Sequence, residues 1–299
     1  MPTTIRPARA EELEAAQALV VHSINDLTRR HGFGAMASLR PATFQLFSHR
    51  DDPEGLWVAE ADGEIVGFAF SWVCGTFWFL AELFVAPDQQ GRGTGEALLK
   101  RAFDHASNAG AQNKALITFA FNTVSQGLYI RHGLYPRLPI YFYRADAKAV
   151  RQYDGEILRH VEIGDTDEDR EQLAQLDASV LGFSRDKHHR FLLGDTSTRG
   201  AFLYANAACI GYAYFNSGGH VGPLAVSQPG LMGPGLATVL KLAAEGGASD
   251  ISAFLPGTGE AALSTAAAHG MRITFPMVLL SAHEFGDFSR YLPRNPGFM

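Results

Sequence analysis

The alternation of hydrophobic and polar positions divides the chain into two halves with the same order of elements. Each half opens with a short strand and a helix whose apolar residues recur at helical spacing, Glu11–Leu27 in the first and Arg170–Leu181 in the second. Both halves end in a strand, a helix that closes on a His-Gly pair, and a further apolar strand. The pattern therefore predicts a tandem repeat of the order β-α-β-β-β-α-β-α-β.

The strands between these ends are predicted from period-two alternation and the turns that bound them. They are Leu56–Ala61, Ile65–Val73, Phe77–Val85 and Ala115–Phe121 in the first half, and Phe202–Asn206, Cys209–Asn216, Val221–Val226 and Asp250–Leu255 in the second. A joint is expected near Asp146–Asp154, where an apolar strand gives way to charged residues. Because 299 residues are enough for two domains, we expect one domain at 1–146 and another at 155–299.

Composition narrows the class of protein. The chain is 46% hydrophobic and 19% charged, which is typical of a folded globular protein, and its formal net charge of -6 disfavours nucleic acid as a partner. Cys74 and Cys209 lie in runs that read as buried strands, and we expect them to be reduced, as in a cytoplasmic protein. We expect no export signal and no membrane span, and no metal because the histidines show no metal-ligand spacing.

The stretch that carries most chemical information runs from Leu80 to Leu99. An apolar strand leads into three alternating glycines, Gly91, Gly93 and Gly95, and then into a helix. Glycines allow a positive φ and a close approach of the backbone, and the first N–H groups of a helix have no internal partner, so this arrangement suits a diphosphate. The spacing fits neither the G-x-G-x-x-G of a dinucleotide site nor the Gly-Lys of a Walker loop.

The run Gln90-Gly91-Arg92-Gly93-Thr94-Gly95 matches Q/R-x-x-G-x-G/A, and here the chain closely resembles the GNAT superfamily of N-acetyltransferases. Residues 122–134 are similar to the family's N-x-x-A-x-x-L-Y-x-x-x-G-F and depart from it at Ser125 and Leu134. The resemblance covers residues 4–145. It implies an α/β (α+β) fold of two tandem GNAT-like domains, each a mixed, mostly antiparallel central sheet flanked by helices, with acetyl-CoA as co-substrate.

The resemblance also assigns the residues that would bind the coenzyme. The strand at Leu83–Val85 would separate from its neighbour and pair with the pantetheine arm, while backbone amides of the glycine loop would hold the pyrophosphate. Arg92 would add charge near a phosphate or do nothing specific, and Asn122 would bond the pantetheine, cap a helix, or both. The full set is Leu83, Phe84, Val85, Gln90, Gly91, Arg92, Gly93, Thr94, Gly95 and Asn122.

Two residues are candidates for catalysis. By resemblance, Tyr129 approaches the coenzyme sulfur, where a phenol can protonate the departing thiolate, although a tyrosine that only packs is the alternative. Glu82 points to the opposite strand face from Leu83. It would take the amine proton, often through water. Alternatively, it would merely bind a cationic substrate or cap the strand edge.

The second half lacks the corresponding groups. Counting back from Gly270 places Ala266 where the first half has Tyr129 and Gly259 where it has Asn122. The loop at 228–235 contains two prolines, which remove N–H donors that a diphosphate would use. We therefore expect a degenerate GNAT-like domain that has lost the coenzyme and shapes the acceptor site of the first.

The function expected from these features is acetyl-CoA-dependent N-acetylation of a primary amine of a small molecule, by direct attack in a ternary complex. A non-catalytic acyl-CoA sensor and a protein or peptide N-acetyltransferase are the alternatives. The sequence does not identify the acceptor, and it leaves a homodimer open.

Overall fold

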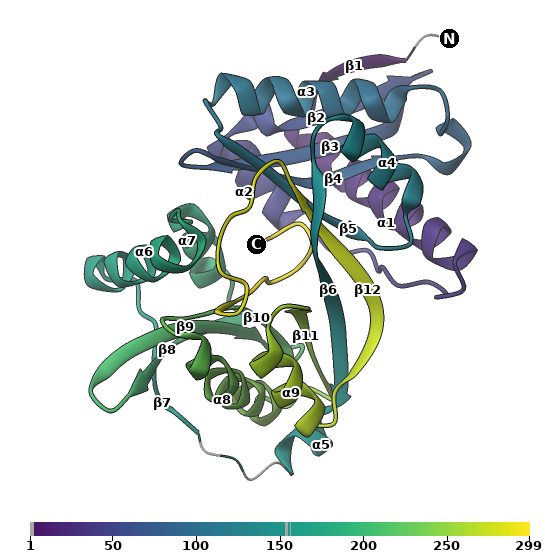
Figure 1. Ribbon diagram of the computed structural model, residues 1–299. Helices are drawn as coiled ribbons and strands as arrows, with labels where there is room; N and C mark the ends of the chain where they lie inside the picture. Colours follow the sequence, from purple (N-terminus) through teal and green to yellow (C-terminus); the bar gives the residue numbers. More distant parts are fainter. Residues whose placement is uncertain (1–2, 153–154, 156) are drawn as a thin grey trace. The chain divides into compact units, whose positions relative to one another are not determined.

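A computed structural model describes residues 3–152, 155 and 157–299 and divides the chain into two compact units (Figure 1). The first unit runs to Tyr135 and includes Leu280–His283, and the second comprises Pro136–Leu279 and Glu284–Met299. The expected joint near 146–154 ends in residues 153–154, which lie outside the described residues. The domain boundaries at 146 and 155 stay predictions.

The first unit is a sheet with helices on both faces. Its strands are β1 (Thr4–Pro7), β2 (Leu56–Ala61), β3 (Glu64–Cys74), β4 (Phe77–Val85) and β5 (Asn113–Phe119). Its helices are α1 (Leu13–Arg30), α2 (Thr43–Asp51), α3 (Thr94–Asn108) and α4 (Thr123–Arg131), with short 3-10 turns at Ala10–Glu12, Pro53–Gly55 and Pro87–Gln89. The strands lie in chain order and pair antiparallel except for the parallel pair β4 and β5, and α1 and α3 lie on opposite faces (Figure 1).

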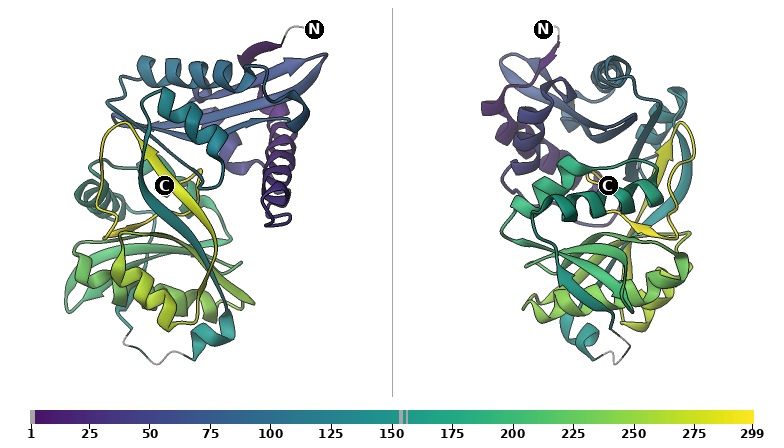
Figure 2. Two further views of the ribbon diagram at one scale, coloured as in Figure 1. Left: turned by 45° about the vertical axis from the view of Figure 1, so that its right-hand side comes forward. Right: turned by 90° about the vertical axis from the view of Figure 1, so that its left-hand side faces the viewer.

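The second unit repeats this order. Its strands are β6 (Tyr135–Asp146), β7 (Arg159–Glu162), β8 (Thr198–Ala205), β9 (Ala208–Asn216), β10 (His220–Val226), β11 (Asp250–Pro256), β12 (Arg272–Ser281) and β13 (Tyr291–Leu292). Its helices are α5 (Ala147–Arg151), α6 (Asp167–Leu181), α7 (Asp186–Gly194), α8 (Met232–Glu245) and α9 (Glu260–Ala268), with a 3-10 turn at Pro229–Leu231. In this unit α6 and α7 lie on one face of the sheet, and α8 and α9 on the other (Figure 2). The expected fold class and tandem repeat are confirmed, and α2, α7 and β13 are additions to the predicted order.

The strand β6, which closes the first half of the sequence, lies almost wholly in the second unit, and the end of β12, which closes the second half, lies in the first. In the second unit β6 pairs antiparallel with β11, from Asp146 opposite Asp250 to Ile140 opposite Pro256. In the first unit the end of β12 lies beside β5, where the Ala282 N–H donates to the Lys114 carbonyl at 2.9 Å. The first half of the sequence therefore supplies a strand to the second unit, and residues 280–283 of the second half lie in the first unit.

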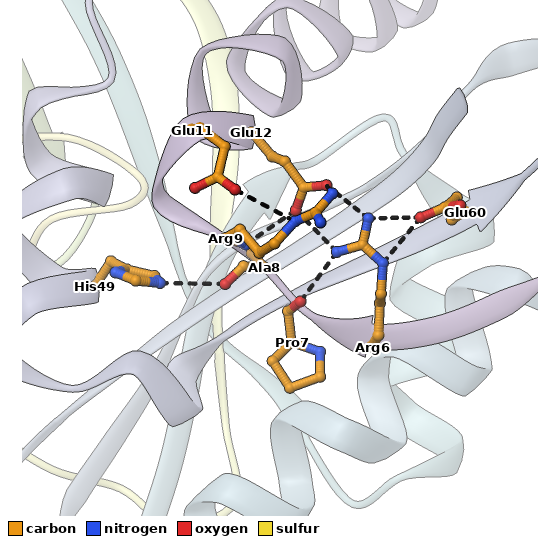
Figure 3. A network of polar contacts seen from close by, with 8 residues as sticks. All are labelled: Arg6, Pro7, Ala8, Arg9, Glu11, Glu12, His49 and Glu60. Carbon is orange, nitrogen blue, oxygen red and sulfur yellow. Dashed lines mark hydrogen bonds and ion pairs between the residues drawn. The ribbon is translucent and has the colours of Figure 1, made fainter. Parts of the chain in front are cut away.

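A charged network holds the start of the first sheet in register (Figure 3). The Arg6 guanidinium on β1 donates to Glu12 at 2.6 and 2.8 Å and to Glu60 on β2 at 2.5 and 2.9 Å. The pKa of Glu12 is held well below its usual range, chiefly by the hydrogen bond from Arg6. His49 on α2 contacts the Ala8 carbonyl at 3.1 Å, so the first strand is also tied to α2.

Each unit buries its own apolar core. In the first, Ala59, Ala69 and Val85 of the sheet pack against Leu98 of α3. In the second, α8 packs Leu236 and Leu240 onto strands β9 to β11. Among the described residues, no helix is long and apolar enough to cross a membrane.

Candidate functional site

The edge of β4 opens toward β5 halfway along the strand. The parallel pairing runs from Phe77 opposite Asn113 to Leu80 opposite Leu116, although both strands continue beyond these residues. A β-bulge at Ala81 shifts the register between β4 and β3 at the same point. Because a bulge bends the strand that carries it, β4 turns away from β5 over its last residues. The pairing with β5 thus ends before Leu83–Val85, where we predicted that the strand separates from its neighbour.

A glycine loop connects this open edge to α3. Gly91 and Gly93 have φ of 77° and 82°, a left-handed conformation that glycine adopts without strain. A Cβ atom at either position would meet no atom of the described residues within 4 Å, so the space above the loop is open. Gly93 is the N-cap of α3, and no described side chain caps that helix end. The first N–H groups of α3, from Thr94 onward, are thus available to an anion.

The other loop residues have local roles. Gln90 Nε2 donates to the Val85 carbonyl at 3.0 Å and closes the loop onto the end of β4. The Arg92 guanidinium is exposed and donates to Gln89 Oε1 at 2.9 Å. A Cβ atom on Gly95 would lie 3.7 Å from Val85, an ordinary contact. The conformational requirement for glycine is therefore at Gly91 and Gly93.

Asn122 and Tyr129 lie at the two ends of α4. Asn122 is the N-cap, and its Oδ1 accepts a hydrogen bond from the Ser125 N–H at 3.3 Å, so the capping role is present. Tyr129 is buried near the C-terminal end of the helix. Burial raises the pKa of Tyr129, which keeps the phenol protonated at neutral pH and able to donate.

Glu82 carries a buried carboxyl group on β4. Its Oε1 accepts a hydrogen bond from Gln45 on α2 at 3.0 Å, whereas its Oε2 is buried without a partner in the described part of the chain. Burial raises the pKa of Glu82 to about 7, and the hydrogen bond from Gln45 opposes the rise. Leu83 packs on the α3 face of the sheet, so Glu82 and Leu83 lie on opposite faces, as alternation predicts.

Sequence reasoning missed the residues that surround Glu82. Gln45 Nε2 donates to Gln17 on α1 at 2.8 Å as well as to Glu82, which links three elements at one carboxylate. No motif marks either glutamine. The helix α2 itself was not predicted, so nothing in the pattern placed Gln45 beside β4.

In the second unit the corresponding edge is covered by the chain itself. The parallel pairing of β10 with β11 is limited to His220 and Val221, but β13 then pairs antiparallel with β10 through Leu224 and Ala225. The Val226 N–H also donates to the Arg290 carbonyl at 3.0 Å. The strand edge that is open in β4 is therefore occupied in β10.

The loop before α8 also differs from the loop before α3. Residues 229–231 form a 3-10 turn that runs directly into α8, and Gly233 and Gly235 lie inside that helix. Neither glycine has the positive φ of Gly91 or Gly93. The described residues contain no group of three or more His, Cys, Asp and Glu side chains placed to hold a metal ion.

Comparison with known proteins finds similarity to one family over part of the chain. The sequence profile of the acetyltransferase (GNAT) family matches residues 21–134. An uncharacterised N-acetyltransferase of Archaeoglobus fulgidus is 40% identical over 65 residues, which cover 18% of this chain and 42% of that protein. The chain thus spans less than half the length of this curated relative.

Solved structures share the fold over nearly the whole chain. A candidate acetyltransferase of Pyrococcus horikoshii has a TM-score of 0.75 at 15% identity and covers 97% of this chain and 92% of its own. A GCN5-related N-acetyltransferase of Sphaerobacter thermophilus has a TM-score of 0.65 at 16% identity, and the match covers 96% of this chain and 98% of that protein. A tandem GNAT protein from the clavulanic acid biosynthesis pathway has the same TM-score at 17% identity, covering 94% and 98%. At these identities the likeness concerns the fold.

Proposed function

The chain belongs to the GNAT superfamily of N-acetyltransferases, and from this premise we propose that its first unit transfers the acetyl group of acetyl-CoA to a primary amine of a small molecule. One observation carries the proposal. The open edge of β4 leads directly into a loop whose left-handed glycines leave the N-terminus of α3 uncapped. A strand edge that can pair with an amide-bearing arm thus adjoins an anion site, which is the shape that an acyl-coenzyme requires.

In this proposal the backbone at Leu83–Val85 pairs with the pantetheine arm and the amides of residues 90–95 hold the pyrophosphate. Glu82 takes a proton from the substrate's ammonium group through water, and the neutral amine nitrogen then attacks the thioester carbon. The tetrahedral intermediate gives its second nitrogen proton to water and the carbon–sulfur bond breaks. Tyr129 supplies a proton to the departing thiolate and regains one from solvent. Glu82 suits a base because its pKa lies near neutrality and its Oε2 is unpartnered among the described residues.

The loss of folding stability that Glu82 causes favours a catalytic role over that of a non-catalytic acyl-CoA sensor. A buried carboxyl oxygen without a hydrogen bond destabilises the folded protein. A sensor that only holds the coenzyme has no use for such a group, whereas an acyl transfer reaction needs it. A peptide acceptor stays an alternative to the small amine. The proposal includes no metal, nucleic acid or membrane, and it locates the protein in the cytoplasm.

We assign one coenzyme site to the chain, in the first unit. The pairing of β13 with β10 supports this assignment, because the residues at 290–292 use the backbone groups that a pantetheine arm would need. The counterparts of Tyr129 and Asn122 are Ala266 and Gly259, both buried and without a polar side chain. The second unit then serves to shape the acceptor site.

The experiment incubates the full chain with acetyl-CoA and a panel of amino acids, polyamines, aminoglycosides and peptides, and measures free thiol. Turnover with a small amine, lost or strongly reduced in Glu82→Gln, is the expected result. Calorimetry of acetyl-CoA binding should give one site per chain. Thiol release with peptides alone would replace the small amine by a peptide, and two equivalent coenzyme sites would refute the assignment to the first unit.

A further inference from the structure

Gln45 has both of its amide hydrogens engaged. Its side chain is buried, and Nε2 donates to Glu82 Oε1 at 3.0 Å and to Gln17 Oε1 at 2.8 Å. A glutamine amide has two N–H donors on one side and one carbonyl acceptor on the other. As placed, Glu82 Oε1 and Gln17 Oε1 both accept, so the Gln45 amide lies with its nitrogen toward Glu82.

This contact determines which oxygen of Glu82 is available to accept a proton. Oε1 is occupied by Gln45, and Oε2 is buried without a partner in the described part of the chain. A donated hydrogen bond stabilises the carboxylate form, whereas burial stabilises the protonated form. Gln45 is thus the group that keeps a buried carboxyl able to ionise.

In the described part of the chain, no charged side chain contributes to the pKa shift of Glu82. Burial and the hydrogen bond from Gln45 account for the altered pKa of Glu82, with no contribution from a charged neighbour. On α1, Glu14 accepts a hydrogen bond from the Ala42 N–H, and on α2, His49 contacts the Ala8 carbonyl. On β3 the residue opposite Glu82 is Phe70. The carboxyl group therefore responds to the glutamine alone.

We propose that Gln45 and Gln17 are positioning residues that hold Glu82 ionised with Oε2 directed to the acceptor amine. Gln17 acts on Gln45, since its oxygen keeps the Gln45 nitrogen on the side of Glu82. Without Gln17 the Gln45 amide can rotate and turn its oxygen toward Glu82 Oε1. Two oxygen atoms can share a hydrogen bond there only when the Glu82 carboxyl group is protonated. The inference rests on the proposed role of Glu82 as the base.

The first test needs no acceptor. The full chain is labelled with 13C at the glutamate carboxyl carbons, the Glu82 signal is assigned by its loss in Glu82→Gln, and its chemical shift is followed against pH. The wild-type signal is expected to titrate near pH 7. In Gln45→Leu the midpoint should rise by about one pH unit or more, because a hydrogen bond to a charged group is lost. Gln17→Leu should move it in the same direction by less.

Gln126→Leu is the matched control. Gln126 on α4 also donates twice through Nε2, to the carbonyls of Ala120 and Phe119 at 2.8 and 3.4 Å, but it does not contact Glu82. Its loss removes two hydrogen bonds from the same unit and should leave the Glu82 midpoint unchanged. An equal shift in this variant would mean that any loosening of the unit moves Glu82, which would overturn the proposal.

The second test is the pH profile of kcat/KM with the best amine of the panel. Because Glu82 must be ionised to accept a proton, activity rises with pH through its pKa, and Gln45→Leu should displace this limb to higher pH. At pH 7 the variant should lose about fivefold in rate and recover most of it two pH units higher. A uniform loss at every pH, or an unmoved 13C midpoint in Gln45→Leu, would refute the positioning role. Full activity of Glu82→Gln would instead refute the role of Glu82 in the proposed function, while the 13C titration would still report on the glutamines.

Discussion

Two glycines with a left-handed backbone conformation lie at opposite ends of α3. Substituting each of them distinguishes an effect on coenzyme binding from an effect on folding. Gly93 is the N-cap of α3 with φ of 82°, and Gly110 follows its C-terminus with φ of 67°. At both positions a Cβ atom would meet no atom of the described residues within 4 Å. Alanine at either site therefore adds backbone strain without a clash, and the two variants should resemble each other in stability.

The expected magnitudes differ only for binding. A non-glycine residue in this conformation costs about 1–2 kcal/mol, which the stiffer unfolded chain offsets in part, so each variant should lose about 1 kcal/mol. For a unit of this size that corresponds to a Tm lower by roughly 3–5 °C. Gly93→Ala also places a methyl group where the diphosphate would approach. Loss of one hydrogen bond to a charged group there should weaken acetyl-CoA binding about 10- to 100-fold.

The assay pairs thermal unfolding with calorimetric titration of acetyl-CoA on the full chain. Gly110→Ala should reproduce the lower Tm of Gly93→Ala while it keeps the wild-type Kd. A wild-type Kd in both variants would show that the glycine loop does not approach the coenzyme. Equal losses would show that affinity merely follows stability, and either result would refute the assignment of this loop.

The segment from β4 to α3 was predictable because its information is local. Strand alternation, glycine spacing and helical periodicity all lie within about twenty residues, and each has a direct conformational meaning. The opposite faces of Glu82 and Leu83 follow from the same alternation. The protonation behaviour of Glu82 does not, because it depends on Gln45 from a helix whose apolar residues Phe44, Leu46 and Phe47 make no regular pattern.

The placement of β6 in the second unit and of the end of β12 in the first could not be read from the pattern. Alternation shows that β6 and β12 are strands, but a strand carries the same signal whichever sheet it joins. The two residues of β13 are too few to give any signal, although they decide what covers β10. Burial of Arg185 beside Asp177 was equally hidden, since charged residues are ordinarily read as exposed.

The remaining predictions concern one residue in each unit. Tyr129→Phe keeps the buried ring but removes the proton donor, so kcat should fall about 10²- to 10⁴-fold with acetyl-CoA affinity unchanged in calorimetry; an unchanged kcat would leave Tyr129 a packing residue. In the second unit, burial opposes ionisation of Asp177, but Arg185 and His189 outweigh it and hold its pKa well below the usual range. A carboxylate with a lowered pKa stabilises the folded state above its unfolded pKa of about 4, and this stability is lost as the pH falls below that value. Asp177→Asn leaves Arg185 buried without its counter-ion and should cost about 3–5 kcal/mol in urea unfolding at pH 7. Below pH 4 the unfolded wild type takes up a proton at Asp177 and its stability falls progressively toward the lower folded pKa, so the gap between the two proteins should narrow; a gap independent of pH would show that packing, not charge, makes Asp177 necessary.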